Sequence, residues 1–202
     1  MRIGPKYKIA RRLGSPVFEK CQTQKFALSE ARHAKTKKRG KRRALSSYGS
    51  QLIEKQKIRY TYGITEHQLA NYIGKATSQK RGSSKEILFQ LLESRLDNVV
   101  YRVGLADTRR QARQMVSHGH IVINGKRTLV PSYSVSIGDV FTIRDGSKAS
   151  PLFANLEKKT KDFITPPWVS FDHNSLSGKI LGIPTGEEPT LDFGVVIEFY
   201  SR

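Results

Sequence analysis

The uneven distribution of positive charge is the feature that most limits what this sequence can fold into. The 202 residues carry a formal net charge of +19. Residues 1–45 hold 15 basic and 2 acidic side chains, whereas residues 146–202 hold 6 basic and 7 acidic ones. Because like charges repel one another, we expect residues 1–45 to form a basic extension with little core of its own, ordered by a polyanion.

The densest part of this charge spans residues 35–43, where seven of nine positions are basic. No nearby acid is available to pair with them, so phosphate groups are the expected counter-charges. An anionic membrane surface would also attract such a block, but no amphipathic or lipidated element accompanies it. A nucleic acid is therefore the favoured partner.

Composition excludes several other classes of protein. The single cysteine, Cys21, rules out a disulfide framework and a zinc site made of several cysteines. No run of about 18 apolar residues is present, so we expect neither a membrane span nor a signal peptide. These observations predict a soluble intracellular protein.

The middle of the chain has a helical pattern. Ser50 is the expected N-cap of a helix that Gly63 ends, and Thr65 and Gln68 form a capping box at the start of the next helix. A third helical stretch follows and ends at Gly104. Residues 46–93 are therefore expected to form a helical domain.

Residues 94–145 are expected to form a small module of two short helices and a twisted sheet. The signature Ser94-x-x-Asp97 predicts a helix start, and Thr108 caps a second helix. The period then changes to two, and Asn124-Gly125 predicts a hairpin. Beyond this module, residues 146–202 are expected to end in a β-strand at 195–200.

Basic residues recur through this module in positions that favour RNA. Arg109 and Arg113 share one face of the second helix, with Arg110 beside them, and the hairpin can bring Lys126 and Arg127 nearby. The forked guanidinium group of arginine pairs well with phosphate. We therefore expect this cluster to contact RNA.

The motifs of this module resemble those of a known family. SRLDNVVYR at 94–102, TRRQARQ at 108–114 and ING at 123–125 are similar to the small-subunit ribosomal protein uS4 (S-four) family. Matching segments near both ends of the chain extend the resemblance over almost its whole length. Several linked blocks in the same order make this resemblance specific.

The pattern of segments and the resemblance together predict an α+β fold. It comprises a basic N-terminal arm over 1–45, a helical rRNA-binding domain over 46–93 and the RNA-binding module over 94–145. A linker and C-terminal segment over 146–202 would pack back on the helical domain.

The resemblance implies a structural constituent of the small ribosomal subunit. Such a protein is a primary rRNA binder that nucleates assembly of the small-subunit body, lies near the mRNA entrance and contributes to translational accuracy. Its implied partners are small-subunit ribosomal RNA, neighbouring proteins such as ribosomal protein S-five, and mRNA at the entrance. It would reside in a cytoplasmic or organellar ribosome.

No catalytic residue, cofactor or metal site is expected. Many bacterial members of the family carry a four-cysteine zinc site in the arm, whereas this chain has only Cys21 and resembles the zinc-free variant. The residues expected to contact RNA are basic or can donate hydrogen bonds: Arg11, Arg12, Lys35, Lys37, Lys38, Arg39, Lys41, Arg42, Arg43, Tyr48, Lys55, Lys57, Arg59, Arg95, Arg109, Arg110, Arg113, Ser117, His118, His120, Lys126 and Arg127.

Two alternatives belong to other classes. Pseudouridine synthases carry a similar module and use the aspartate of an Arg-Leu-Asp motif, which is present here at Arg95-Leu96-Asp97. Asp97 falls in the first turn of a predicted helix, where a carboxylate suits the helix dipole, and no segment is large enough for a catalytic domain. A free-standing RNA-binding stress or quality-control protein is the second alternative. The basic arm at 1–45 makes it less favoured.

Overall fold

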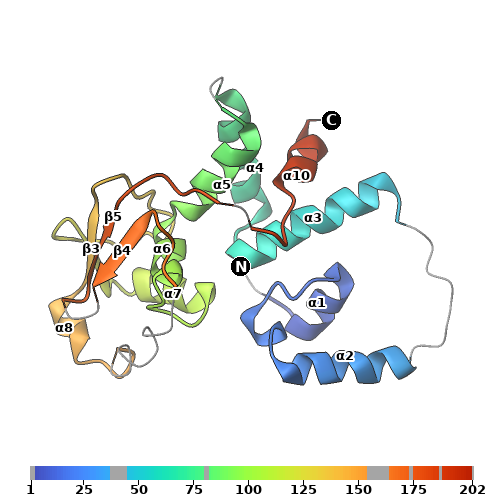
Figure 1. Cartoon of the computed structure of the whole chain (residues 1–202), viewed down its shortest axis with the longest axis horizontal. Helices are drawn as coiled ribbons and strands as arrows, with labels where there is room; N and C mark the ends of the chain where they lie inside the picture. The colour runs from blue at the N-terminus through green and yellow to red at the C-terminus, as the bar shows by residue number, and fades with distance from the viewer. Residues whose placement is uncertain are drawn as a thin grey trace. The chain divides into compact units, whose positions relative to one another are not determined.

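The structure is a computed structural model that describes residues 3–36, 45–79, 82–153, 164–172, 175–186 and 188–201 (Figure 1). The chain forms two compact units, Met1–Leu88 with Glu188–Arg202, and Phe89–Glu187. Helices make up the first unit, and the second combines helices with an antiparallel sheet. The predicted α+β class is confirmed. None of the helices in the described ranges is long and apolar enough to cross a membrane.

The helices have these bounds, with η1 a short 3-10 helix: α1 Lys6–Leu13, η1 Glu19–Cys21, α2 Gln24–Thr36, α3 Ser47–Tyr62, α4 Glu66–Ser78, α5 Ser84–Glu93, α6 Leu96–Arg102, α7 Arg109–Ser117, α8 Asp145–Lys148 and α10 Phe193–Tyr200.

The N-terminal arm has a small core of its own within residues 3–36. Ala10, Phe18, Cys21 and Phe26 are buried together, because the left-handed turn at Gly14 lets the chain fold back after α1. Four residues make only a small core, as expected for this arm, and Tyr60 of α3 packs against it. The apolar positions are widely spaced along the sequence, so they show no local pattern.

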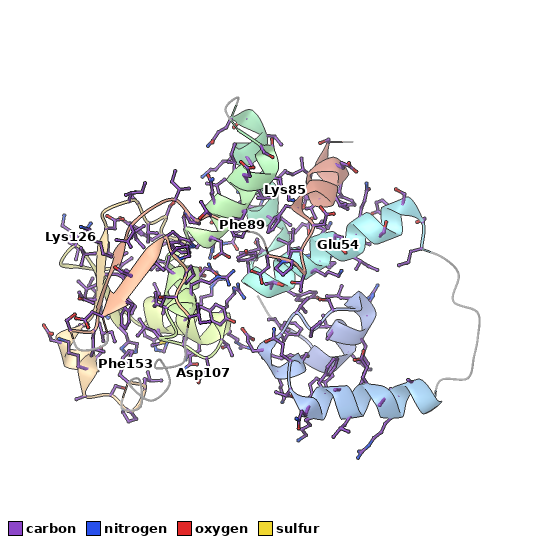
Figure 2. All side chains as sticks on the ribbon, in the orientation of Figure 1. Glu54, Lys85, Phe89, Asp107, Lys126 and Phe153 are labelled. Atoms are coloured by element: carbon purple, nitrogen blue, oxygen red, sulfur yellow. The ribbon has the colours of Figure 1, made fainter. Side chains whose placement is uncertain are left out.

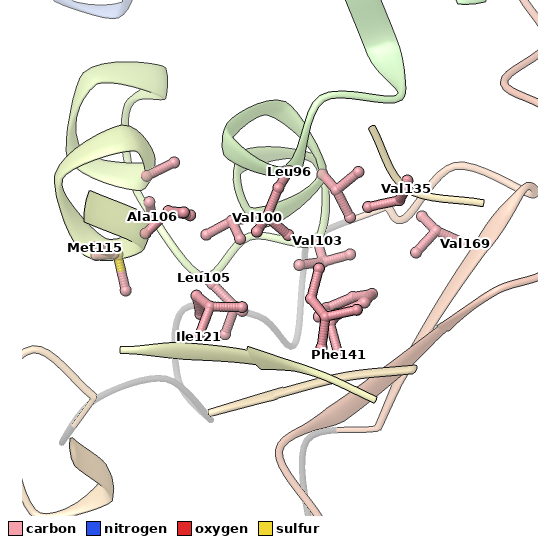
Figure 3. Close-up of a cluster of buried hydrophobic side chains, with 14 of the residues drawn as sticks. Leu96, Val100, Val103, Leu105, Ala106, Met115, Ile121, Val135, Phe141 and Val169 are labelled. Carbon is pink, nitrogen blue, oxygen red and sulfur yellow. The ribbon is translucent and has the colours of Figure 1, made fainter. Parts of the chain in front are cut away.

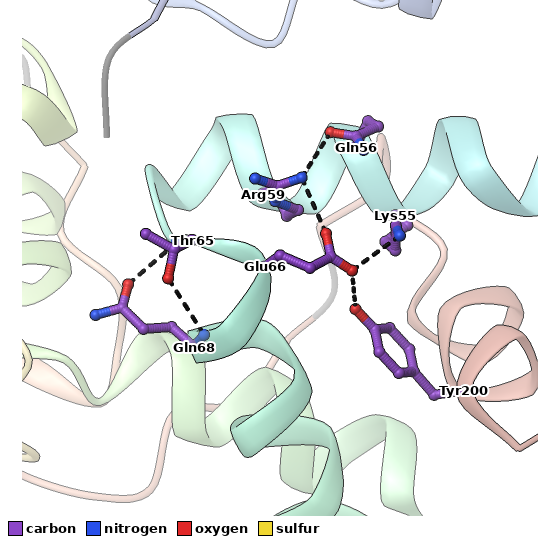
Figure 4. Close-up of polar contacts among 7 residues, drawn as sticks. All are labelled: Lys55, Gln56, Arg59, Thr65, Glu66, Gln68 and Tyr200. Carbon is purple, nitrogen blue, oxygen red and sulfur yellow. Dashed lines mark hydrogen bonds and ion pairs between the residues drawn. The ribbon is translucent and has the colours of Figure 1, made fainter.

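Local capping signals explain where α3 and α4 begin and end. Ser46, rather than the expected Ser50, caps α3, since its Oγ accepts from the backbone N–H of Gly49 at 3.2 Å. Gly63 ends α3 in a left-handed conformation, as predicted. The predicted capping box of α4 is also confirmed, with both bonds between Thr65 and Gln68 present (Figure 4).

The predicted closing strand at 195–200 is wrong, because these residues form α10. The side chain of Asp192 caps this helix by accepting from the backbone N–H of Val195 at 3.1 Å. Phe193 and Val196 are buried, and α10 packs against α3 and α4. A short apolar run does not reveal its own period, so packing overrides the strand propensity of its valines and isoleucine.

In the second unit, α7 begins as predicted and α6 does not. Thr108 Oγ1 accepts from the backbone N–H of Gln111 at 3.1 Å. Ser94, the expected cap of α6, instead donates to the carbonyl of Gln90, and Arg95 occupies the N-cap position without a side-chain cap.

Within the described residues, five antiparallel strands form one sheet in the order β2-β1-β3-β5-β4. Their bounds are β1 Ile121–Ile123, β2 Lys126–Arg127, β3 Val140–Ile143, β4 Val169–Asp172 and β5 Ser177–Ile180. The predicted hairpin is present, with Asn124 and Gly125 both at positive φ between β1 and β2. Strands β4 and β5 were not specified from the sequence.

The core of the second unit lies between the sheet and the pair α6 and α7 (Figure 3). Val100 from α6, Val103 directly after α6, Met115 from α7, and Ile121 and Phe141 from the strands contribute to it. This core fixes α7 on the sheet with one side turned outward.

Candidate nucleic-acid interface

The outward side of α7 carries exposed polar residues above a buried apolar stripe. Ala112, Met115 and Val116 are buried. Arg110 and His118 are exposed, and Arg113 is half-buried. The predicted Ser117 is also exposed, and its hydroxyl donates to the carbonyl of Arg113 at 2.8 Å. The helix therefore presents cations from a rigid base.

The hairpin brings a second cationic element to the end of this helix. Lys126 and Arg127 are exposed on β2, an edge strand, and Lys126 lies at the outer side of the sheet (Figure 2). A guanidinium nitrogen of Arg127 donates to the carbonyl of His118 at 3.1 Å. The side chain of Arg127 passes so close to Gly119 that a Cβ there would lie 2.2 Å from its Nε. Gly119 thus lets Arg127 lie against the end of α7.

His120 lies beside His118 but is more enclosed. Its Nδ1 is 2.9 Å from Ser147 Oγ, and the two imidazole centroids are 6.0 Å apart. Burial lowers the pKa of His120, and electrostatic interactions with His118, Arg144 and Arg127 lower it further. His120 is therefore mainly neutral at pH 7 and can offer a hydrogen bond rather than a charge.

Arg95 has a structural position. Its side chain is 1% exposed, and Nε and one terminal nitrogen donate to the two carboxylate oxygens of Asp97 at 3.0 and 2.7 Å. A guanidinium group buried in this way lies away from the surface, so we remove Arg95 from the set expected to contact RNA. The spacing of the arginines in the sequence did not predict the burial of Arg95. Arg95 precedes α6, so helical periodicity does not tell whether its side chain is exposed.

Arg109 is partly exposed and held by neighbours on α6. Its Nε donates to Asn98 Oδ1 at 2.8 Å, and its guanidinium carbon lies 4.4 Å from the ring centroid of Tyr101. Asn98 is buried and was not among the expected site residues. Asn98 lies within the SRLDNVVYR motif, but the motif alone does not predict this contact, because it joins α6 to α7.

In the first unit, three basic residues expected to contact RNA form ion pairs with acidic residues of the same unit. Lys55 is only 8% exposed, donates to Glu66 at 2.8 Å and lies over the ring of Phe199. Arg59 also pairs with Glu66, at 2.9 Å (Figure 4). Lys57 is 2.6 Å from Glu54, its neighbour one turn earlier. Because Lys55 is buried, we remove it too from the expected set.

The remaining expected residues fall into three groups. Arg12 and Tyr48 are exposed, whereas Arg11 is half-buried and donates to Ser29 Oγ at 2.7 Å. Lys35 belongs to α2, but its side chain is outside the description. The rest of the basic block lies outside the described residues: Lys37, Lys38, Arg39, Lys41, Arg42 and Arg43.

Among the described residues, no group of three or more histidine, cysteine, aspartate or glutamate side chains could hold a metal ion. Cys21 is buried and forms no disulfide. Burial raises the pKa of the Cys21 thiol, which keeps it protonated at neutral pH.

A helical unit and a second unit of helices on a small antiparallel sheet define this α+β chain, and comparisons with known proteins identify its class. The family described as "Ribosomal protein S4/S9 N-terminal domain" matches residues 1–93, and the family described as "S4 domain" matches residues 94–141. Three relatives, each described as "Small ribosomal subunit protein uS4", match over 98% of this chain and 98% of their own length. They come from Acetivibrio thermocellus (41% identical over 204 residues), Thermotoga maritima (41% over 205) and Roseiflexus sp. strain RS-1 (42% over 205).

The chain therefore belongs to the uS4 family of small ribosomal subunit proteins. The resemblance stated from its motifs is confirmed. It is a ribosomal protein and not an enzyme, so the pseudouridine synthase and the free-standing stress protein are set aside.

Proposed function

We propose that the chain is a structural constituent of the small ribosomal subunit that binds small-subunit ribosomal RNA. As a primary binder it nucleates assembly of the small-subunit body, lies near the mRNA entrance beside ribosomal protein S-five, and contributes to translational accuracy. The observation that carries this proposal is the match to small ribosomal subunit proteins over 98% of both chains.

The surface assigned to RNA lies on the second unit. Charge and hydrogen-bond donors come from Arg110, Arg113 and His118 at α7, which packs on the core, and from Lys126 and Arg127 on β2, which pairs with the core strand β1. Arginine pairs with phosphate through two parallel hydrogen bonds, so its direction matters as well as its charge. A rigid set of this kind favours one spacing of phosphates over others.

The arm contributes in another way. Arg11, Arg12 and the basic block at 35–43 raise the positive potential of the first unit. Phosphate contacts of this type bind any RNA and weaken steeply with salt. We assign general affinity to the arm and shape preference to the second unit.

The test is a pair of binding titrations with the full chain. One RNA is a junction-containing fragment from the body of a bacterial small-subunit ribosomal RNA, and the other is a simple duplex of equal length. The proposal predicts tighter binding to the junction at every salt concentration, with both affinities falling as salt rises. Equal affinity for the two RNAs, or an affinity that salt does not change, would contradict it.

A further inference from the structure

A chain of polar contacts runs through the second unit from a buried acid to Arg109. The side chain of Glu93 is 1% exposed. Arg102 donates to both of its carboxylate oxygens, from Nε at 2.8 Å and from a terminal nitrogen at 2.9 Å. A buried carboxylate needs such partners, and here they fix the position of the acid.

Asn98 connects this acid to Arg109, and its two ends are not interchangeable. The amide nitrogen Nδ2 donates to Glu93 Oε2 at 2.8 Å. Only that end of an amide can donate to a carboxylate, so Oδ1 must face the other way. There it accepts from Arg109 Nε at 2.8 Å. Glu93 thereby sets which atom of Asn98 meets Arg109.

A second contact fixes the plane of the Arg109 guanidinium. Its central carbon lies 4.4 Å from the centroid of the Tyr101 ring, a cation–π distance. Asn98 thus holds the guanidinium at Nε while Tyr101 holds its face, and the side chain remains partly exposed. A long side chain held in this way loses less conformational freedom when it binds.

We propose that Asn98, oriented by Glu93, is a positioning residue that sets Arg109 in the direction needed for an RNA phosphate, so that Arg109 contributes to recognition of RNA shape and not only to affinity. This inference rests on the proposed function, because it requires the second unit to bind RNA. Asn98 itself is buried and does not touch the RNA.

A double-mutant cycle separates positioning from a purely structural role. The wild-type chain, Asn98→Ala, Arg109→Ala and the double variant are titrated with the junction RNA and with the duplex. If Asn98 acts through Arg109, Asn98→Ala lowers the junction preference by about tenfold in the wild-type background and by less than about twofold in the Arg109→Ala background. An equal loss in both backgrounds would overturn the proposal, since Asn98 would then support only the fold.

A control cycle and a second variant make the test specific. Asn98→Ala combined with Arg110→Ala should show additive effects on the junction preference, because Arg110 is exposed on α7 whereas the Oδ1 of Asn98 accepts from Arg109.

Tyr101→Leu removes the ring that lies against the Arg109 guanidinium and leaves Asn98 in place, so it provides the same comparison if Asn98→Ala does not fold. Its effect should also depend on Arg109, and independence would count against the proposal.

The same data distinguish this inference from the proposed function. A wild-type chain that binds the junction no better than the duplex contradicts the proposed function itself. A wild-type preference that survives Asn98→Ala and Tyr101→Leu in folded protein, checked by circular dichroism, contradicts only the positioning role.

Discussion

The hydroxyl of Tyr200 donates a hydrogen bond to the carboxylate of Glu66, 134 residues earlier in the chain. Glu66 also accepts from Lys55, and Arg59 pairs with its other oxygen (Figure 4). One carboxylate therefore joins α3, α4 and α10 within the first unit. Lys55 and Arg59, both expected to contact RNA, thus pair with an acid of their own unit.

Loss of the Tyr200 hydroxyl should destabilise the first unit. Tyr200→Phe removes a hydrogen bond to a charged group and should lower the free energy of unfolding by about 1–2 kcal/mol. Tyr48→Phe is the matched control, because Tyr48 is exposed and its hydroxyl has no such acceptor among the described residues. Urea unfolding followed by circular dichroism measures both. Equal effects of the two variants would show that the bond to Glu66 contributes nothing.

The same carboxylate gives unfolding a defined pH dependence. Burial opposes ionisation of Glu66, but hydrogen bonds from Lys55 and Tyr200 and the charges of Lys55 and Arg59 outweigh it and lower its pKa below the usual 4.5. A lowered pKa in the folded state stabilises the fold above the unfolded-state pKa, and this stabilisation is lost as pH falls through the folded-state value.

The wild-type chain should therefore be more stable than Glu66→Gln at pH 7, with a difference that shrinks as pH falls below about 4.5. Urea unfolding of both proteins at pH 7, 5 and 3.5 measures the difference. A difference that stays constant over this range would mean that the charge of Glu66 is not what stabilises the cluster.

The buried pair of Arg95 and Asp97 should matter far more than an exposed pair. Asp97→Asn leaves the guanidinium of Arg95 buried without its counter-charge, and should lower the free energy of unfolding of the second unit by about 3 kcal/mol. Asp145→Asn makes the same change in the exposed pair with Lys148, where solvent screens the interaction, and should have little effect on stability. Thermal unfolding compares the two. Similar losses would contradict the structural role given to Arg95.

Gly178 permits close contact between β5 and β3. A Cβ at this position would lie 2.2 Å from the ring of Phe141, so Gly178→Ala should force the strands or the ring to shift and cost about 1–3 kcal/mol. Gly146→Ala is the control, since a Cβ there meets nothing within 4 Å. Thermal unfolding measures both variants. A Gly178→Ala chain as stable as the control would show that Phe141 has room to move.

Local signals predicted the parts of the fold that depend on neighbouring residues. The Thr65–Gln68 capping box, the Thr108 cap and the Asn124-Gly125 turn each involve bonds or backbone angles within a few residues. Strands β4 and β5 lacked such a signal, because each has only four residues and the close contact of Gly178 with Phe141 depends on how β5 pairs with β3. Tertiary packing likewise decided the helical state of α10.

The candidate site was predictable as a surface but not in its internal contacts. Exposed cations at 110, 126 and 127 follow from helical period and turn geometry. The burial of Arg95 and the ion pair between Lys55 and Glu66 depend on which elements pack together, and the sequence does not show this packing. A basic residue in a sequence does not reveal whether phosphate or a carboxylate of its own chain will pair with it.

The comparison of two charge-removing variants tests the central claim most directly. Arg110→Ala with Arg113→Ala removes two cations from α7. Lys148→Ala with Lys179→Ala removes two exposed cations elsewhere in the same unit. Titrations with junction and duplex RNA at several salt concentrations, on variants shown by circular dichroism to be folded, give affinity, preference and salt slope.

We predict that the α7 variant loses about tenfold or more of its junction affinity and most of its preference, with a salt slope reduced by about one unit for each phosphate that it no longer neutralises. The control variant should keep the preference. If the α7 variant and the control variant lower the affinity for the junction and for the duplex by the same factor, α7 does not recognise RNA shape.

A variant with Lys37, Lys38, Arg42 and Arg43 changed to alanine should lower the affinity for junction and duplex by similar factors. If that variant alone loses the preference, the arm and not α7 recognises the RNA.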